Sequence, residues 1–173
     1  MDDVRIELKG LDKFKDFIDT RIFEKAMKRT IRDEGRRFKT TAVKQVRKTY
    51  NIKSARLKKV MSINVSGSTW RMKIKSRSLG LYNFSAKQTK KGVSFMVKKG
   101  NRQKLRNAFI ARDANGKMRV FERKTKRRLP LKSLYSISPT QMFNKEVLEL
   151  CQKQFEEHYA QTFEKNLNFY MKK

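Results

Sequence analysis

The stretch KTYNIKSARLKKV, residues 48–60, marks the point at which the pattern of the chain changes from helix to sheet. Before it, apolar residues recur every three or four positions, the period of an amphipathic helix. After it, apolar and polar residues alternate, the period of a strand. Ile52 and Leu57 lie inside the stretch, and we expect both to be buried beneath a corner of the chain.

The same stretch also resembles a helix-turn-helix, with residues 50–52 as the turn and Ser54 as the cap of a short helix. A DNA-reading motif of that kind packs its recognition helix within a unit of three short helices. Here a long helix precedes the turn and sheet follows it. The long polar residues of the short helix are Lys and Arg, which suit contacts with phosphates and not with base edges. We therefore predict a corner, and sequence-specific recognition is the alternative.

A long basic helix is predicted over residues 20–50, before the corner. Its apolar residues share one face, opposite a face of Lys and Arg. Gly35 lies on the apolar side, where we expect a close neighbour, because glycine inside a helix otherwise costs about 1 kcal/mol. The apolar face consists of Phe23, Met27, Ile31, Phe38, Ala42 and Val46. Ahead of this helix, residues 1–19 are expected to form a short strand that includes Leu8 and an amphipathic turn of helix over residues 11–18.

Residues 60–135 are expected to form an antiparallel sheet built from hairpins. Apolar and polar residues alternate on both sides of a Gly-Ser pair at residues 67–68. They alternate again on both sides of Asn115-Gly116, which is the strongest short turn signal in the chain. Pro130 keeps its segment out of any central strand, because proline has no amide hydrogen to donate to a neighbour.

A second long helix is predicted over residues 138–171, with Ser138, Pro139 and Gln141 forming a capping box at its start. Its apolar residues recur every fourth position, so the apolar stripe winds round the helix by about 40° at each step. One flat neighbour cannot cover such a stripe. The two ends should therefore meet different neighbours, either both within the chain or with the far end on another subunit. The candidates for a subunit interface are Phe155, Tyr159, Phe163 and Leu167.

These patterns predict an α+β fold, with a long N-terminal helix and a C-terminal helix flanking an antiparallel β-sheet. The chain holds only two Pro and seven Gly, which leaves little room for a flexible linker. We therefore expect a single domain of residues 1–173.

The formal net charge of +29 is concentrated in the middle of the chain. Residues 35–112 contain 23 Lys or Arg and no Asp or Glu, whereas residues 1–34 and 136–173 are each neutral. Such a field repels itself unless an anion is near, so we expect the partner to be a polyanion or an acidic protein. The alternative is a solvated surface that keeps the protein soluble. The candidates to face nucleic acid are Lys25, Arg29, Arg32, Arg36, Arg47, Lys53, Arg56, Lys58 and Lys59.

Residues that would support catalysis are scarce. The only histidine is His158 and the only cysteine is Cys151, and both fall within the C-terminal helix pattern. They do not assemble into a catalytic triad or a metal cluster, and no glycine-rich phosphate loop is present. We expect no enzyme, no cofactor, no metal and no small-molecule substrate. The chain also lacks an apolar run long enough to span a membrane and an N-terminal signal core, so we expect it to begin in a cytoplasm.

In the order and spacing of its segments the chain resembles the minor tail protein Z family of long-tailed phages and prophages. The resemblance covers roughly residues 20–170. It is carried, in order, by KTYNIKSARLKK (48–59), GVSFMVKKG (92–100), NAFIARDANGKMRVFERK (107–124), RRLPLKSLYSISPTQMF (127–143) and a final amphipathic helix.

The resemblance implies a structural virion protein that completes the tail. Such a protein forms a homo-oligomeric ring at the head-proximal end of the tail, around the DNA path, and helps to join head and tail. Its partners would be its own copies, other tail and head–tail connector proteins, and phage DNA held without sequence preference. It would pass through the host cytoplasm during assembly. Further cations compatible with DNA are Arg119, Arg123, Arg127 and Arg128. The alternative is a free basic nucleic-acid-binding protein, ribosome-associated or of nucleoid type.

Overall fold

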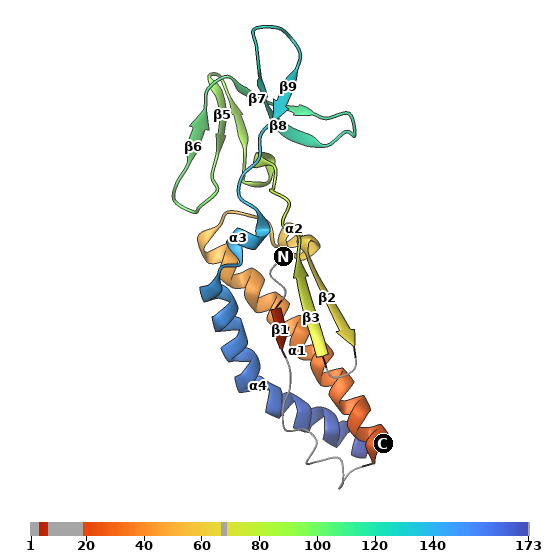
Figure 1. Ribbon diagram of the computed structural model, residues 1–173. Coiled ribbons are helices and arrows are strands. Elements are labelled where there is room, and N and C mark those ends of the chain that lie inside the picture. The colour runs from red at the N-terminus through yellow and green to blue at the C-terminus, as the bar shows by residue number, and fades with distance from the viewer. Residues whose placement is uncertain (1–3, 7–18, 67–68, 173) are drawn as a thin grey trace. The chain divides into compact units, whose positions relative to one another are not determined.

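The computed structural model describes residues 4–6, 19–66 and 69–172 and confirms the α+β fold (Figure 1). The helices are α1 (Thr20–Thr49), α2 (Ser54–Val60), η2 (Leu81–Asn83), α3 (Pro139–Met142) and α4 (Lys145–Met171). The strands are β1 (Val4–Ile6), β2 (Met61–Ser66), β3 (Thr69–Ile74), β4 (Lys87–Thr89), β5 (Gly92–Phe95), β6 (Gln103–Leu105), β7 (Ala108–Arg112), β8 (Met118–Arg123) and β9 (Leu131–Ser133). Leu8, the helical turn expected over residues 11–18 and the turn at residues 67–68 lie outside the described residues.

The chain divides into two compact units. Unit 1 comprises residues 1–43, 61–74 and 144–173, and unit 2 comprises residues 44–60 and 75–143. The expectation of a single domain stays a prediction.

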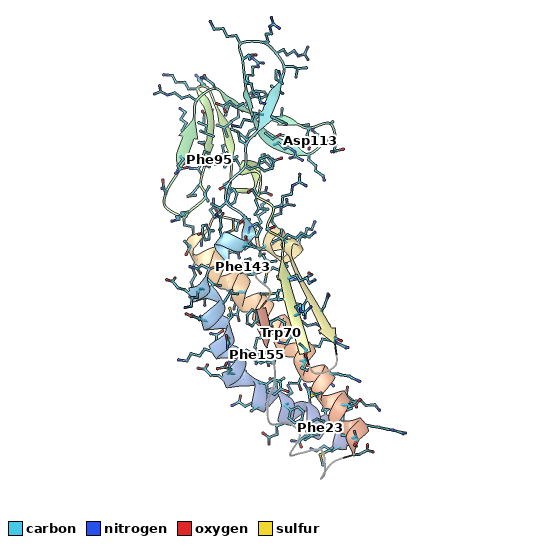
Figure 2. All side chains as sticks on the ribbon, viewed as in Figure 1. Phe23, Trp70, Phe95, Asp113, Phe143 and Phe155 are labelled. Carbon is cyan, nitrogen blue, oxygen red and sulfur yellow. The ribbon has the colours of Figure 1, made fainter. Side chains whose placement is uncertain are left out.

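Unit 1 packs two long helices onto one face of a small sheet. The strand order is β1-β3-β2, and every pair is antiparallel. In β3 the alternation places Trp70 and Met72 inward and Arg71 outward. The ring of Trp70 lies 5.0 Å from that of Phe38 on α1 and 6.1 Å from that of Phe155 on α4, measured between centroids (Figure 2). Both helices therefore meet the inward face of this sheet.

The buried face of α1 is the one that the sequence predicts. Phe23, Ile31 and Phe38 are at most 3% exposed, whereas Met27 is only partly buried. Gly35 is buried, and a Cβ atom built there would lie 3.5 Å from Cγ2 of Ile63 on β2. The close neighbour expected at Gly35 is thus a side chain of the sheet.

The C-terminal segment forms two helices, so the prediction of one helix over residues 138–171 is wrong at its start. Ser138 caps α3 with the predicted capping box, but α3 ends after four residues. Asn144 then caps α4, its side chain accepting a hydrogen bond from the Val147 amide at 3.1 Å. Asparagine competes with the helical backbone for hydrogen bonds and favours a new helix start. Phe143, between the two helices, is 3% exposed.

Unit 2 holds two three-stranded antiparallel sheets, of order β4-β5-β6 and β7-β8-β9. The hairpin of β7 and β8 turns at Asn115-Gly116, as predicted, and Gly116 has a positive φ of 71°. With the sheet of unit 1, the strands are distributed over three small sheets and not over one. The tight turn before Gly92, whose φ is 133°, pairs β4 with β5 in a local hairpin. This local pairing is one reason why the strands do not form a single sheet. One hydrophobic cluster of unit 2 is formed by Leu81, Val93, Phe95, Ala108 and Val120.

The corner over residues 48–60 buries the two residues expected beneath it. Ile52 is 5% exposed and Leu57 is fully buried. The helix α2 begins at Ser54, and the Lys53 carbonyl accepts hydrogen bonds from the amides of Arg56 and Leu57. Lys53 therefore stands at the cap position that we predicted for Ser54. The chain continues directly from α2 into β2, so the three-helix arrangement of a DNA-reading motif does not follow the turn.

Candidate nucleic-acid interface

Positive charge is concentrated in unit 2. This unit contains 26 Lys or Arg and two Asp or Glu, a net charge of +24, whereas unit 1 has a net charge of +5. One of the two acids of unit 2, Asp113, is held inside the β7–β8 hairpin (Figure 2). It accepts hydrogen bonds from the Asn115 and Lys117 amides, at 2.9 and 2.8 Å, and pairs with Arg119 at 2.5 Å. The hydrogen bond from the Lys117 amide lowers the pKa of Asp113 most, and the hydrogen bond from the Arg119 side chain lowers it further.

Arg119 is therefore occupied by contacts inside the hairpin. Besides Asp113 it contacts the Tyr135 hydroxyl at 2.9 Å, and the bond to Asp113 raises its pKa. Of the four cations that the sequence added to the DNA-compatible surface, Arg119 is half-buried. The other three, Arg123, Arg127 and Arg128, are exposed.

The basic face of α1 is partly neutralised within unit 1. Its four candidates are Lys25, Arg29, Arg32 and Arg36. Asp33 lies between them and approaches Arg29 at 3.8 Å and Arg36 at 3.9 Å. The Arg29 guanidinium also lies 4.5 Å from the ring centroid of Phe169 on α4. The sequence contains the signal for both pairs, since Asp33 follows Arg29 by four residues and precedes Arg36 by three.

Three other candidates come together at a hollow in unit 2. This hollow, which we call the corner pocket, has a volume of about 510 Å³. It is lined by Arg47, Asn51, Ile52, Lys53, Arg56, Tyr82, Asn83, Ser85, Ala86 and Lys87. The sequence singled out Arg47, Lys53 and Arg56, but it gave no reason to add Lys87, which comes from β4. Lys58 and Lys59 are exposed on α2 and do not line the pocket.

In the part of the chain that the structure describes, the charges of the corner pocket are not balanced by carboxylates. No carboxylate lines it. Within residues 4–6, 19–66 and 69–172, no ion pair joins its cations to an acid. Arg47 is held by a hydrogen bond from its Nε atom to the Ile52 carbonyl at 3.1 Å. The Nδ2 atom of Asn51 is buried and has no hydrogen-bond partner.

A second hollow of similar size lies elsewhere in unit 2. It also measures about 510 Å³, and Lys90, Lys91 and Arg106 supply its cations. The sequence did not single out these three residues. They lie in the acid-free stretch, but nothing in their spacing distinguishes them from its other Lys and Arg.

The apolar stripe of α4 meets two neighbours within unit 1. Phe155 packs on Trp70 of the sheet, whereas the ring of Phe163, farther along, lies 5.5 Å from that of Phe23 on α1. Tyr159 stacks between Phe155 and Phe163, at 5.5 and 6.3 Å. The winding stripe thus has different neighbours at its two ends, as predicted, and both belong to the same chain. The half-buried Leu167 completes the proposed interface set, whose role between subunits stays a prediction.

Residues suited to metal binding do not cluster in the part of the chain that the structure describes. No group of three or more His, Cys, Asp or Glu side chains in those residues is placed to hold a metal ion. His158 is exposed on α4, and burial raises the pKa of the Cys151 thiol to about 11. Among the described residues, no helix is both long and apolar enough to span a bilayer.

Comparison with known families gives one match. The family described as prophage minor tail protein Z (GPZ) matches residues 8–173 of the chain. No curated protein and no solved structure shows significant similarity to it. The match confirms the resemblance and extends it to nearly the whole chain, including both units.

Proposed function

We propose that this chain, which belongs to the prophage minor tail protein Z family, acts at the head-proximal end of the tail. As a member of that family it is a minor phage tail protein and a component of the virion. The proposal adds three elements. Copies of the chain form a ring, the ring surrounds the path of the DNA, and its presence helps to join the head to the tail.

The observation that carries the proposal is the charge of unit 2. Duplex DNA carries one negative charge per about 1.7 Å of its axis, so a ring of basic subunits around it is electrostatically favourable. Each copy would contribute a net charge of +24 from this unit. Contacts of Lys and Arg with phosphates are independent of base sequence and exchange readily, which suits a passage through which a whole genome must move.

Ring formation also requires a surface between copies. Unit 1 has a much smaller net charge than unit 2, +5 against +24, and has long helices, which makes it the better part of the chain for contacts with copies, other tail proteins and connector proteins. The exposed large apolar residues of α4 include Leu150, at 40%, and Met171, at 58%. These sites, with the accessible edges of Tyr159 and Leu167, are the places where we expect neighbouring proteins to pack.

A deletion experiment tests the position of the protein. Particles produced without this chain should accumulate as separate heads and tails in electron micrographs, and the complete chain supplied in trans should restore joining. Normal joining without the chain would refute the head–tail role. If the chain is absent from purified particles yet binds DNA, the free nucleic-acid-binding alternative is correct.

A pair of charge reversals tests the DNA path. Arg127→Glu with Arg128→Glu changes two exposed cations of unit 2. Arg71→Glu with Lys73→Glu changes two exposed cations of unit 1, on β3 and away from α4, and serves as the matched control. Infectious titre per joined particle should fall for the first variant only. If the first variant instead gives unjoined heads and tails, the basic surface faces an acidic protein. If both variants behave like the unsubstituted protein, this part of unit 2 does not face the DNA.

A further inference from the structure

We infer that the corner pocket binds one phosphate group of the DNA backbone, so that unit 2 holds DNA at a defined point and not by diffuse charge alone. The inference rests on the proposed function for the presence of DNA. It adds a site and the chemical group that the site takes.

Four cations converge on the pocket from separate segments of unit 2. Arg47 comes from the end of α1, Lys53 and Arg56 from the corner and α2, and Lys87 from β4. Cations brought together without a counter-ion repel one another, and this repulsion opposes folding. A bound phosphate would remove the repulsion, because it supplies negative charge and several acceptor oxygens at one place.

One hydrogen-bond donor of the pocket, the Arg47 guanidinium, is held in place by the protein. Arg47 is fixed through Nε, which donates to the carbonyl of the buried Ile52 at 3.1 Å, so the terminal amino groups of its guanidinium are left for a ligand. The planar guanidinium then offers parallel N–H groups that match phosphate oxygens.

The size and wall of the pocket favour a backbone phosphate over a free anion. Its volume of about 510 Å³ exceeds what one inorganic phosphate fills. The pocket therefore has room for the sugars on either side of a phosphodiester. Tyr82, which is 41% exposed, gives the wall an apolar surface against which a sugar can pack. Asn83 is less available, because its side-chain amide donates to the Gly80 carbonyl at 2.8 Å.

Paired substitutions in unit 2 test the site. Lys53→Gln with Arg56→Gln removes two charges from the pocket. Lys98→Gln with Lys99→Gln removes two exposed charges outside it, at residues that are not among the nucleic-acid-facing candidates. Binding of a labelled duplex of about 20 base pairs and arbitrary sequence is measured by fluorescence anisotropy over a series of salt concentrations. We expect the pocket variant to lose about tenfold in affinity, with the slope of log K against log salt shallower by about one, the value for one lost phosphate contact. The control variant should stay within about twofold of the unsubstituted protein.

A second pair of variants lies away from α2, so that misfolding of the corner cannot explain a loss of binding. Lys87→Gln, on β4, should also weaken binding, whereas Lys104→Gln, on β6 and outside the pocket, should not. Thermal unfolding of each variant shows whether it is folded. Inorganic phosphate at matched ionic strength should compete only weakly, and complete displacement of the duplex by millimolar phosphate would assign the pocket to a free anion.

The outcomes separate the two proposals. Equal losses in the pocket and control variants would overturn the defined site and leave the DNA-facing function intact, since diffuse charge predicts that result. Failure of the unsubstituted chain to bind duplex DNA at low salt would overturn the DNA-facing function and this inference with it.

Discussion

A buried hydrogen bond between α1 and α4 contributes to the free energy of unfolding of unit 1, and its contribution can be tested by substitution. Asn166 on α4 is 4% exposed and donates from Nδ2 to the Thr30 hydroxyl on α1 at 3.0 Å. Thr30 is fully buried, and its hydroxyl in turn donates to the Ala26 carbonyl at 2.8 Å. The two side chains therefore depend on the contact unequally. Thr30 has a second partner, whereas the Asn166 amide does not have another hydrogen bond in the described residues.

This inequality sets the expected free energies of unfolding. Thr30→Val keeps the shape of the side chain but leaves the buried Asn166 amide without an acceptor, which costs about 1–3 kcal/mol. Asn166→Ala leaves the Thr30 hydroxyl bonded to Ala26, so it should cost only the hydrogen bond itself, about 1 kcal/mol. In the double variant the amide and the hydroxyl are both gone and no donor is left unpaired. We therefore expect the double variant to be more stable than Thr30→Val alone, with a coupling energy of about 1–2 kcal/mol.

The chain carries a suitable probe and a suitable control. Its only tryptophan, Trp70, is 1% exposed in the core of unit 1, so its fluorescence during urea unfolding reports on that unit. With a slope of about 2 kcal/mol per molar urea, a loss of 2 kcal/mol moves the midpoint by about 1 M. Thr40→Val is the matched control, because Thr40 makes the same type of bond, to the Arg36 carbonyl at 2.9 Å, on the exposed side of α1. Its effect should stay below about 0.5 kcal/mol. Strictly additive effects of Thr30→Val and Asn166→Ala would refute the reasoning.

Three further predictions concern single residues. Gly35→Ala should raise the free energy of unfolding of unit 1 by up to about 1 kcal/mol in the same assay, because the added Cβ meets Ile63 at an ordinary 3.5 Å and alanine favours helix. Gly92→Ala should destabilise unit 2 by more than about 3 kcal/mol in circular dichroism melts. Its φ is 133°, and the new Cβ would lie 2.0 Å from the Leu105 carbonyl oxygen; a variant as stable as the unsubstituted protein would disprove this backbone geometry. Native Cys151, with its pKa raised from 9.0 to about 11 by burial, should react with a thiol reagent at pH 8 at least about a hundredfold more slowly than in urea, and equal rates would show that it is accessible.

The sequence was most informative where apolar periodicity decides the structure. The apolar face of α1 could be predicted from Phe23 to Phe38 because burial of a helix face repeats every three or four residues. The β7–β8 hairpin could be predicted because Asn115-Gly116 supplies the positive φ that its turn requires. In both cases a local signal is sufficient, since the neighbours of the element do not change its period.

Other features depend on contacts that local patterns do not contain. The break between α3 and α4 required attention to Asn144, whose capping role competes with an otherwise continuous apolar stripe. The spacing in the sequence predicts that Asp33 pairs with Arg29 and Arg36. Because many Lys and Arg surround Asp33 in the sequence, we did not expect it to neutralise part of the basic face of α1. Lys87 could not be assigned to the corner pocket from the sequence at all. It reaches the pocket only because β4 and the corner fold into one unit.

The charge of unit 2 bears on its folding as well as on its partner. Cations closer together than the screening length of about 10 Å at 0.1 M salt repel one another in the folded state more than in the expanded unfolded chain. Unit 2 counters its 26 Lys or Arg with only two acids, and one of those, Asp113, is committed to the β7–β8 hairpin. Contacts within the unit therefore cannot balance the excess. A protein that never meets a polyanion would gain nothing from such an arrangement, whereas DNA beside the unit would remove the repulsion between its cations. This electrostatic gain belongs to unit 2 as a whole and not to any one side chain, and the corner pocket concentrates it at one place.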